Sequence, residues 1–428
     1  MKNLVSLHPI MTKYNTTRLS SGLRIIHLPS SSPVVYCGIG IAAGSRQESP
    51  GEEGLAHFCE HTTFKGTAKR SSMQILNCLE RLGGDLNAFT NKEDTVFYAA
   101  IQREHFMRAV DLLTDIVFHS QYPQHEIEHE IDVICDEIES YNDSPAELIY
   151  DEFENLLFAG HPLGHNILGT RERVQGFTSV DAQRFTRRYY RPDNAIFFVY
   201  GNIDFPRLVK DLEARCGRLS LSNVEHAADV PVASPPSCSS AHPSHPAHHQ
   251  AHVMLGCKAY AWNDDCNATL SKRERRMPLY LLNNILGGPS MNARLNLSLR
   301  ERHGLVYTVE SSMVSYSDTG CWSVYFGCDH HDVKRCLRLV RNELDRFMQH
   351  PLSDRQLTAA KRQLKGQLTI ACDNREQFAL DFARHFLHNN QERHMTDLLA
   401  RIDSITATQI QDVAQELFAP DRLQLLIL

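Results

Sequence analysis

Short runs of apolar residues in both halves of the chain predict β-strands. The runs LRIIHL and VVYCGIGIA stand near the start, and HVMLGCKAYAW begins at residue 252. Their alternation and their β-branched and aromatic residues are typical of strands in a partly buried sheet. Longer stretches with apolar residues three and four positions apart follow them and predict amphipathic helices.

Two segments from opposite halves share one pattern. Residues 95–117 (TVFYAAIQREHFMRAVDLLTDIV) and 322–344 (WSVYFGCDHHDVKRCLRLVRNEL) align without a gap at an offset of 227. Apolar residues at helical spacing coincide in this alignment: Phe106, Val110, Leu113 and Val117 fall on Val333, Leu337, Val340 and Leu344. We therefore predict an internal duplication. The expected fold class is α+β, with two homologous domains that each consist of a mostly antiparallel sheet backed by helices.

A break in composition separates the two halves. The segment SPPSCSSAHPSHPAHHQAH is rich in Pro, Ser, Ala and His and has neither helical nor strand periodicity. We expect an N-terminal domain at residues 1–218, a linker at 219–251 and a C-terminal domain at 252–428. The linker histidines have no neighbouring carboxylates and no fixed geometry, so they make a poor selective metal site.

The composition of the chain limits which binding partners and which cellular compartment we expect. The chain has 428 residues, 42% of them hydrophobic, and a formal net charge of −7. This balance suits globular domains and does not favour nucleic acid as a partner. The sequence has no run of 18 apolar residues, so we expect no membrane-spanning helix. The twelve cysteines are scattered, often in apolar contexts, so we expect them to be reduced and the protein to be cytoplasmic.

The candidate chemistry begins in GLAHFCEHTTFKGT. Its core, His57-Phe-Cys-Glu60-His61, has the form H-x-x-E-H, an inverted zinc-peptidase signature. At about 100° per residue, His57 and His61 lie roughly 40° apart around a helix and can hold one ion. Two ordinary helix histidines and an exposed glutamate would produce the same sequence motif. The assignment of a zinc site therefore requires a third ligand elsewhere in the chain.

A second helix offers candidates for that ligand. The segment HEIEHEIDVICDEIESYND has an apolar stripe of isoleucines that begins at Ile127. Relative to Ile127, Glu130 and Glu137 project near 300° and 280°, beside the stripe, and Glu126 projects near 260°. A carboxylate at the margin of a core is costly unless it is paired or binds a metal. The angles leave all three open, and arginine partners would also satisfy Glu130 and Glu137.

Four motifs in order resemble one peptidase family. They are GLAHFCEHTTFKGT, GGDLNAFTNKEDTVFYA, EIDVICDEI and HPLGHNILGT. Together they resemble the pitrilysin/insulinase family of zinc peptidases, and most closely its branch of mitochondrial processing peptidase β-subunits and their single-chain bacterial relatives. In this family the third ligand is a Glu about 76 residues beyond the second His, which selects Glu137. Glu130 then matches the family's acidic residue beside the ligands. The resemblance implies one zinc ion per chain.

The resemblance also implies a mechanism and substrate contacts. Three protein ligands leave zinc an open position for water, and Glu60 would act as general base. Asn87 and Ala88 match a segment that pairs with an extended substrate backbone. Arg300 and Tyr307, seven residues apart, match a pair that enters the catalytic chamber and suits hydrogen bonding to the developing oxyanion. A surface ion pair and a core tyrosine are the alternatives for these two.

The expected protein is thus a zinc metalloendopeptidase that hydrolyses unfolded peptides or oligopeptides. The resemblance implies a chamber enclosed by two chains, and we expect a homodimer with peptide as substrate. A non-catalytic structural or partner subunit of the same fold is the alternative. The presence of His57, Glu60, His61 and Glu137 disfavours that alternative.

Overall fold

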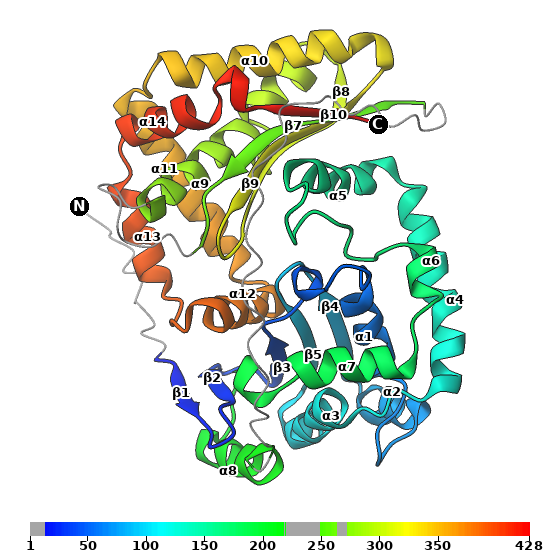
Figure 1. Ribbon diagram of the computed structural model, residues 1–428. Helices are drawn as coiled ribbons and strands as arrows, with labels where there is room; N and C mark the ends of the chain where they lie inside the picture. Colours follow the sequence, from blue (N-terminus) through cyan, green and yellow to red (C-terminus); the bar gives the residue numbers. More distant parts are fainter. Residues whose placement is uncertain (1–12, 218, 220–248, 263–271) are drawn as a thin grey trace, which may run out of the picture. The chain divides into compact units, whose positions relative to one another are not determined.

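The computed structural model describes residues 13–217, 219, 249–262 and 272–428 (Figure 1). Residues 220–248 of the predicted linker lie outside the described residues. Contacts divide the chain into two units. Among the described residues, the first unit gathers 13–135, 167–217, 219 and 372–396, and the second gathers 136–166, 249–262, 272–371 and 397–428.

The first unit is built on a six-stranded sheet with the order β1-β2-β6-β3-β5-β4. Its strands are β1 (Asn15–Arg18), β2 (Arg24–Leu28), β3 (Val34–Ile41), β4 (Asp85–Thr90), β5 (Thr95–Gln102) and β6 (Ala195–Tyr200). All neighbouring pairs are antiparallel except β2 and β6, which run parallel. The segment GGDLNAFTNKEDTVFYA forms the hairpin of β4 and β5.

Helices cover both faces of this sheet. The helices of the first unit are α1 (Leu55–Thr63), α2 (Ser72–Glu80), α3 (Phe106–His119), α6 (Arg171–Val174), α7 (Ser179–Tyr189), α8 (Phe205–Cys216) and α12 (Arg375–Asn389). Successive strand residues face opposite sides, so Val96 packs in the cluster that includes α12, whereas Phe97 contacts Phe64 and Tyr190. Figure 1 shows α3 and α12 on opposite sides of the sheet.

The second unit has a four-stranded antiparallel sheet with the order β10-β7-β9-β8. Its strands are β7 (Ala251–Ala259), β8 (Val306–Ser315), β9 (Gly320–Cys328) and β10 (Gln424–Ile427). Its helices are α5 (Pro145–Leu157), α9 (Lys272–Gly287), α10 (Val333–Gln349), α11 (Asp354–Ala371) and α14 (Ala407–Leu417). Helices α4 (Gln124–Asn142) and α13 (Met395–Ser404) each run through a boundary between units.

The aligned segments of the duplication adopt the same elements. Strand β5 leads through a 3₁₀ turn at Arg103–His105 into α3, and β9 leads through a 3₁₀ turn at His330–Asp332 into α10. The two turns are separated by the same offset of 227 residues as the sequence segments. The predicted α+β class with two similar, mostly antiparallel domains is confirmed.

Each sheet also receives a helix from the other half of the sequence. Helix α12, from the C-terminal half, packs on β3 and β6, and α5, from the N-terminal half, packs on β7 and β10. The hydrophobic clusters show the same exchange of helices between the two halves. Phe382 of α12 lies in a hydrophobic cluster of the first sheet, and Phe153 of α5 lies in one of the second sheet. The division at residues 219–251 stays a prediction from composition, whereas packing interleaves the two halves.

Candidate metal centre and active site

Helix α1 carries the H-x-x-E-H motif, and its start is fixed by Gly54 and Glu48. Gly54 has φ = 96°, and a Cβ there would lie 2.7 Å from the carbonyl oxygen of Leu168. The buried carboxylate of Glu48 accepts hydrogen bonds from the backbone N–H groups of Gly54 (3.0 Å) and Ala56 (2.7 Å). A negative charge at a helix N-terminus is favourable. The helix that carries the motif is therefore held firmly in the first unit.

The histidines of the motif lie together on one side of α1. The ring centroids of His57 and His61 are 4.6 Å apart, and His57 is buried with 7% of its surface exposed. One ligand atom from each ring and one carboxylate oxygen of Glu137 all lie within 4.8 Å of one another. Two imidazoles and a carboxylate form a donor set that zinc favours. These three residues fit a zinc ion, and the donors are near enough to share one.

The three carboxylates that helix angles left open have different surroundings. Glu137 groups with the two histidines, and Glu126 accepts a hydrogen bond from Ser72 (3.0 Å). Glu130 accepts a hydrogen bond from Nδ1 of His61 (2.9 Å) and forms an ion pair with Lys65. Glu130 is buried, as predicted, but Glu137 is exposed. The cost of a carboxylate at the core margin therefore applies to Glu130 and not to Glu137.

Glu130 is held in its ionised form. Burial by itself raises the pKa of its carboxyl, but the hydrogen bonds and charges of His61 and Lys65 outweigh burial and lower the pKa. An ionised carboxylate can only accept hydrogen bonds, so Nδ1 of His61 is the donor. The other ring nitrogen, Nε2, is then the atom with a lone pair for a metal.

Glu60 lies on the same helix and is also buried, with 8% of its surface exposed. Its Oε2 atom accepts a hydrogen bond of 2.6 Å from the hydroxyl of Thr90, the last residue of β4. Thr90 was not among the residues that the sequence singled out. The packing of α1 against β4 brings this hydroxyl to Glu60, so no local signal could have found it.

Strand β4 is one of the two edge strands of the first sheet and pairs with β5. Asn87 lies opposite Tyr98 and Ala88 opposite Phe97. Helix α1 packs against this strand. An edge strand can accept a further extended chain through backbone hydrogen bonds.

The turn of the β4–β5 hairpin is anchored to α12. Asp94 is buried with 1% of its surface exposed, and its carboxylate binds Arg384 (3.0 Å) and His388 (2.9 Å) of α12. Burial by itself raises the pKa of Asp94, but the hydrogen bond from His388 and the charge of Arg384 outweigh it and lower the pKa to about 2. A helix distant in sequence thus holds the hairpin that carries Thr90.

Arg300 and Tyr307 lie together within the second unit. Arg300 belongs to a π-helix at Asn296–Glu301, a helix type that often marks functional positions. Its guanidinium carbon lies 5.6 Å from the ring centroid of Tyr307, the second residue of β8. Tyr307 is 81% exposed, so the alternative of a core tyrosine is wrong.

An α+β fold with two similar domains and a His-His-Glu group defines the class of two-domain metallopeptidases. The family profile described as Insulinase (Peptidase family M16) matches residues 25–171. The profile described as Peptidase M16 inactive domain matches residues 176–364. The chain belongs to peptidase family M16.

Relatives agree with this assignment over nearly the whole chain. The uncharacterized zinc protease YmxG of Bacillus subtilis is 30% identical over 94% of this chain and 95% of its own length. An uncharacterized zinc protease of Streptomyces coelicolor is 31% identical over 96% of this chain and 88% of its own length. The predicted resemblance to this family of zinc peptidases is confirmed.

Solved structures share the fold. A protease from Helicobacter pylori superposes with a TM-score of 0.87 at 20% identity, covering 97% of this chain and 99% of its own. A peptidase M16 inactive domain from Pseudomonas fluorescens has a TM-score of 0.83 at 20% identity and covers 97% of both chains.

Proposed function

We propose that this chain is a zinc-dependent endopeptidase that cleaves unfolded peptides or oligopeptides. The observation that carries the proposal is the group formed by His57, His61 and Glu137, beside the buried Glu60. Membership in a family whose relatives are named zinc proteases supports it. A non-catalytic subunit would have no need of this combination of residues, which disfavours the alternative.

The proposed chemistry divides between the metal and the chain. Zinc held by His57, His61 and Glu137 would polarise the scissile carbonyl and make a water molecule more acidic. Glu60 accepts the proton of that water as general base and passes it to the leaving amine. The hydroxyl of Thr90 orients the Glu60 carboxylate during both transfers.

The edge strand β4 provides a way to bind substrate. We assign Asn87 and Ala88 to backbone pairing with an extended peptide, because this strand borders α1 and ends the sheet. Backbone pairing gives affinity with loose sequence preference and requires an unfolded substrate. Arg300 and Tyr307 are assigned as hydrogen-bond donors to the substrate carbonyl, by resemblance and because the pair is accessible to solvent.

A direct test combines metal analysis with digestion of a mixed peptide library by the purified chain. We expect one zinc per chain and internal cleavage that a chelator abolishes. Glu60→Gln should retain zinc and lose at least about 100-fold in kcat, because general acid–base catalysis contributes that much. The matched control is Glu128→Gln, an exposed acid on α4, which should leave kcat unchanged. Unchanged turnover in Glu60→Gln would refute the proposal.

Two further parts of the proposal concern assembly and compartment. We propose a homodimer that encloses the catalytic chamber, and light scattering of the purified chain tests it. We also propose a cytoplasmic location, since the ten described cysteines form no disulfide bonds with one another and nine of them are buried. No helix in the described part of the chain has the length and apolar character needed to cross a membrane.

A further inference from the structure

Lys65 occupies a defined place just beyond the motif helix. Its backbone N–H donates to the carbonyl oxygen of Thr62 (3.1 Å), so the turn that ends α1 fixes its position. Its ammonium group forms an ion pair with Oε2 of Glu130. The other oxygen of the same carboxylate accepts the hydrogen bond from His61. One carboxylate on α4 is therefore held at both oxygens by residues that belong to α1 or follow it directly.

This arrangement is mostly shielded from water. The side chain of Glu130 is 10% exposed and that of Lys65 is 24% exposed. A buried carboxylate without a partner would be costly, and a charged partner offsets that cost only when the two are well placed. Removing the ammonium would leave Glu130 with a weaker hold on its orientation beside His61.

We propose that Lys65 is a positioning residue for the metal centre, acting through Glu130 to orient His61 so that its Nε2 atom faces the ion. A carboxylate that accepts from one nitrogen of a metal-binding histidine fixes both the tautomer and the ring orientation. Lys65 in turn fixes the carboxylate. This inference rests on the proposed function and extends it to a residue that itself binds neither zinc nor substrate.

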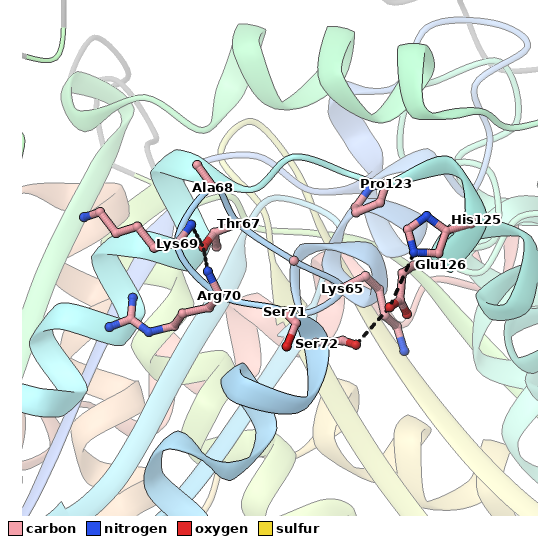
Figure 2. A pocket seen from close by; sticks show the side chains of 11 residues that line it. Lys65, Thr67, Ala68, Lys69, Arg70, Ser71, Ser72, Pro123, His125 and Glu126 are labelled. Carbon is pink, nitrogen blue, oxygen red and sulfur yellow. Dashed lines mark hydrogen bonds and ion pairs between the residues drawn. The ribbon is translucent and has the colours of Figure 1, made fainter.

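The neighbouring loop offers a matched control. Lys65, Lys69 and Arg70 line a pocket of about 380 Å³ between this loop and the start of α4. In Figure 2 the side chains of Lys65 and Lys69 point in opposite directions. Arg70 binds Asp111 and Asp115. Lys69 lies in the same loop as Lys65 and has the same charge. Its side chain is exposed, whereas Lys65 is the lysine that pairs with Glu130.

The experiment measures zinc affinity by competition with a chromophoric chelator. We expect Lys65→Met to weaken zinc binding by up to about 10-fold, because losing a direct partner of a metal ligand costs roughly 10- to 100-fold and Lys65 acts one contact further from the ion. Lys65→Arg, which retains the charge, should restore most of the affinity, and Lys69→Met should match the wild-type chain. In peptide hydrolysis at saturating zinc, Lys65→Met should lower kcat and leave KM unchanged.

A double-mutant cycle with Glu130→Gln separates positioning from a general structural role. If Lys65 acts through Glu130, Lys65→Met should have little further effect on zinc affinity in the Glu130→Gln background. Additive effects would overturn the inference. The metal-free Lys65→Met chain should melt at a lower temperature than the wild type, because the buried Glu130 loses its charged partner. If Lys65→Met does not fold, Lys65→Gln takes its place in the cycle.

The outcome also distinguishes this inference from the proposed function. A wild-type chain that binds no zinc would refute the proposed function. A wild-type chain that binds zinc, loses it in His61→Ala and keeps it equally well in Lys65→Met and Lys69→Met would overturn only the role of Lys65.

Discussion

A single hydroxyl group, that of Thr90, orients the carboxylate of the proposed general base Glu60. Thr90 donates to Glu60 over 2.6 Å, and hydrogen bonds to charged groups contribute about 1.5–3 kcal/mol. We expect Thr90→Val to lower kcat/KM by roughly 10- to 100-fold without loss of zinc. Thr90→Ser, which retains the hydroxyl, should recover most of the activity. Equal activity of the Val and Ser variants in a peptide cleavage assay would show that this hydrogen bond has no catalytic role.

The third ligand can be tested against a neighbour on the same helix. Glu137 and Glu128 are both exposed on α4, but only Glu137 groups with His57 and His61. Glu137→Gln should weaken zinc binding by more than about 100-fold, because it removes a direct ligand and even indirect partners cost up to that much. Glu128→Gln should bind zinc like the wild-type chain. Metal analysis after dialysis against a weak chelator measures both, and equal zinc retention would contradict the assignment.

How much of the site the sequence could predict depends on how far apart its parts lie in the chain. The two histidines and Glu60 fall within five residues, so helix geometry alone groups them. Angles on α4 narrowed the third ligand to three acids, and only the resemblance selected Glu137. Thr90 and Lys65 carry no local signal of their role, because their partners come from tertiary packing.

Asp94 links two elements, the β4–β5 hairpin and α12, through its contacts with Arg384 and His388. Its lowered pKa, about 2 against an ordinary value of 3.8, corresponds to roughly 2 kcal/mol of stability. Because the pKa is lower in the folded chain, this contribution is complete above about pH 4 and is lost as the pH falls towards 2. We expect Asp94→Asn to lower the free energy of unfolding by roughly 2 kcal/mol at pH 7.

Urea unfolding of the metal-free proteins at pH 7, 4 and 3 checks this prediction. The difference between wild type and Asp94→Asn should shrink between pH 4 and pH 3, while Asp85→Asn, an exposed acid on β4, should differ little from wild type at any pH. A difference that does not change with pH would mean that the charge of Asp94 is not what anchors the hairpin.

Strands and helices with a clear hydrophobic periodicity could be predicted from the sequence. The elements against which they pair or pack could not. The runs near residues 24, 34 and 251 became β2, β3 and β7 because alternation determines which side chains are buried. The hairpin within GGDLNAFTNKEDTVFYA was missed, since its β4 half has only intermediate or exposed residues and a weak apolar pattern. The parallel pairing of β2 with β6 joins segments about 170 residues apart, and no periodicity reports such a pairing.

At the scale of the whole molecule, the exchanged helices make a prediction about cooperativity. Phe382 of α12 is fully buried against the first sheet, where its ring contacts Tyr14, Phe198 and Tyr200. Although Phe382 belongs to the C-terminal half of the sequence, truncating it should destabilise the first unit. Phe→Ala changes in cores cost about 3–5 kcal/mol. A unit destabilised to this extent should open more often and exchange its amide hydrogens faster.

Hydrogen exchange followed by mass spectrometry distinguishes units defined by packing from domains defined by sequence halves. In Phe382→Ala, exchange should accelerate most in β3 and β6, and less in β7 and β9. The matched control is Phe326→Ala on β9, equally buried in the second unit, which should show the opposite order. If Phe382→Ala instead accelerates exchange in β7 and β9 and leaves β3 and β6 protected, stability follows the halves 1–218 and 252–428. In that case the packing of α12 contributes little to the stability of the first sheet, because the strands of one cooperative unit lose their protection from hydrogen exchange together.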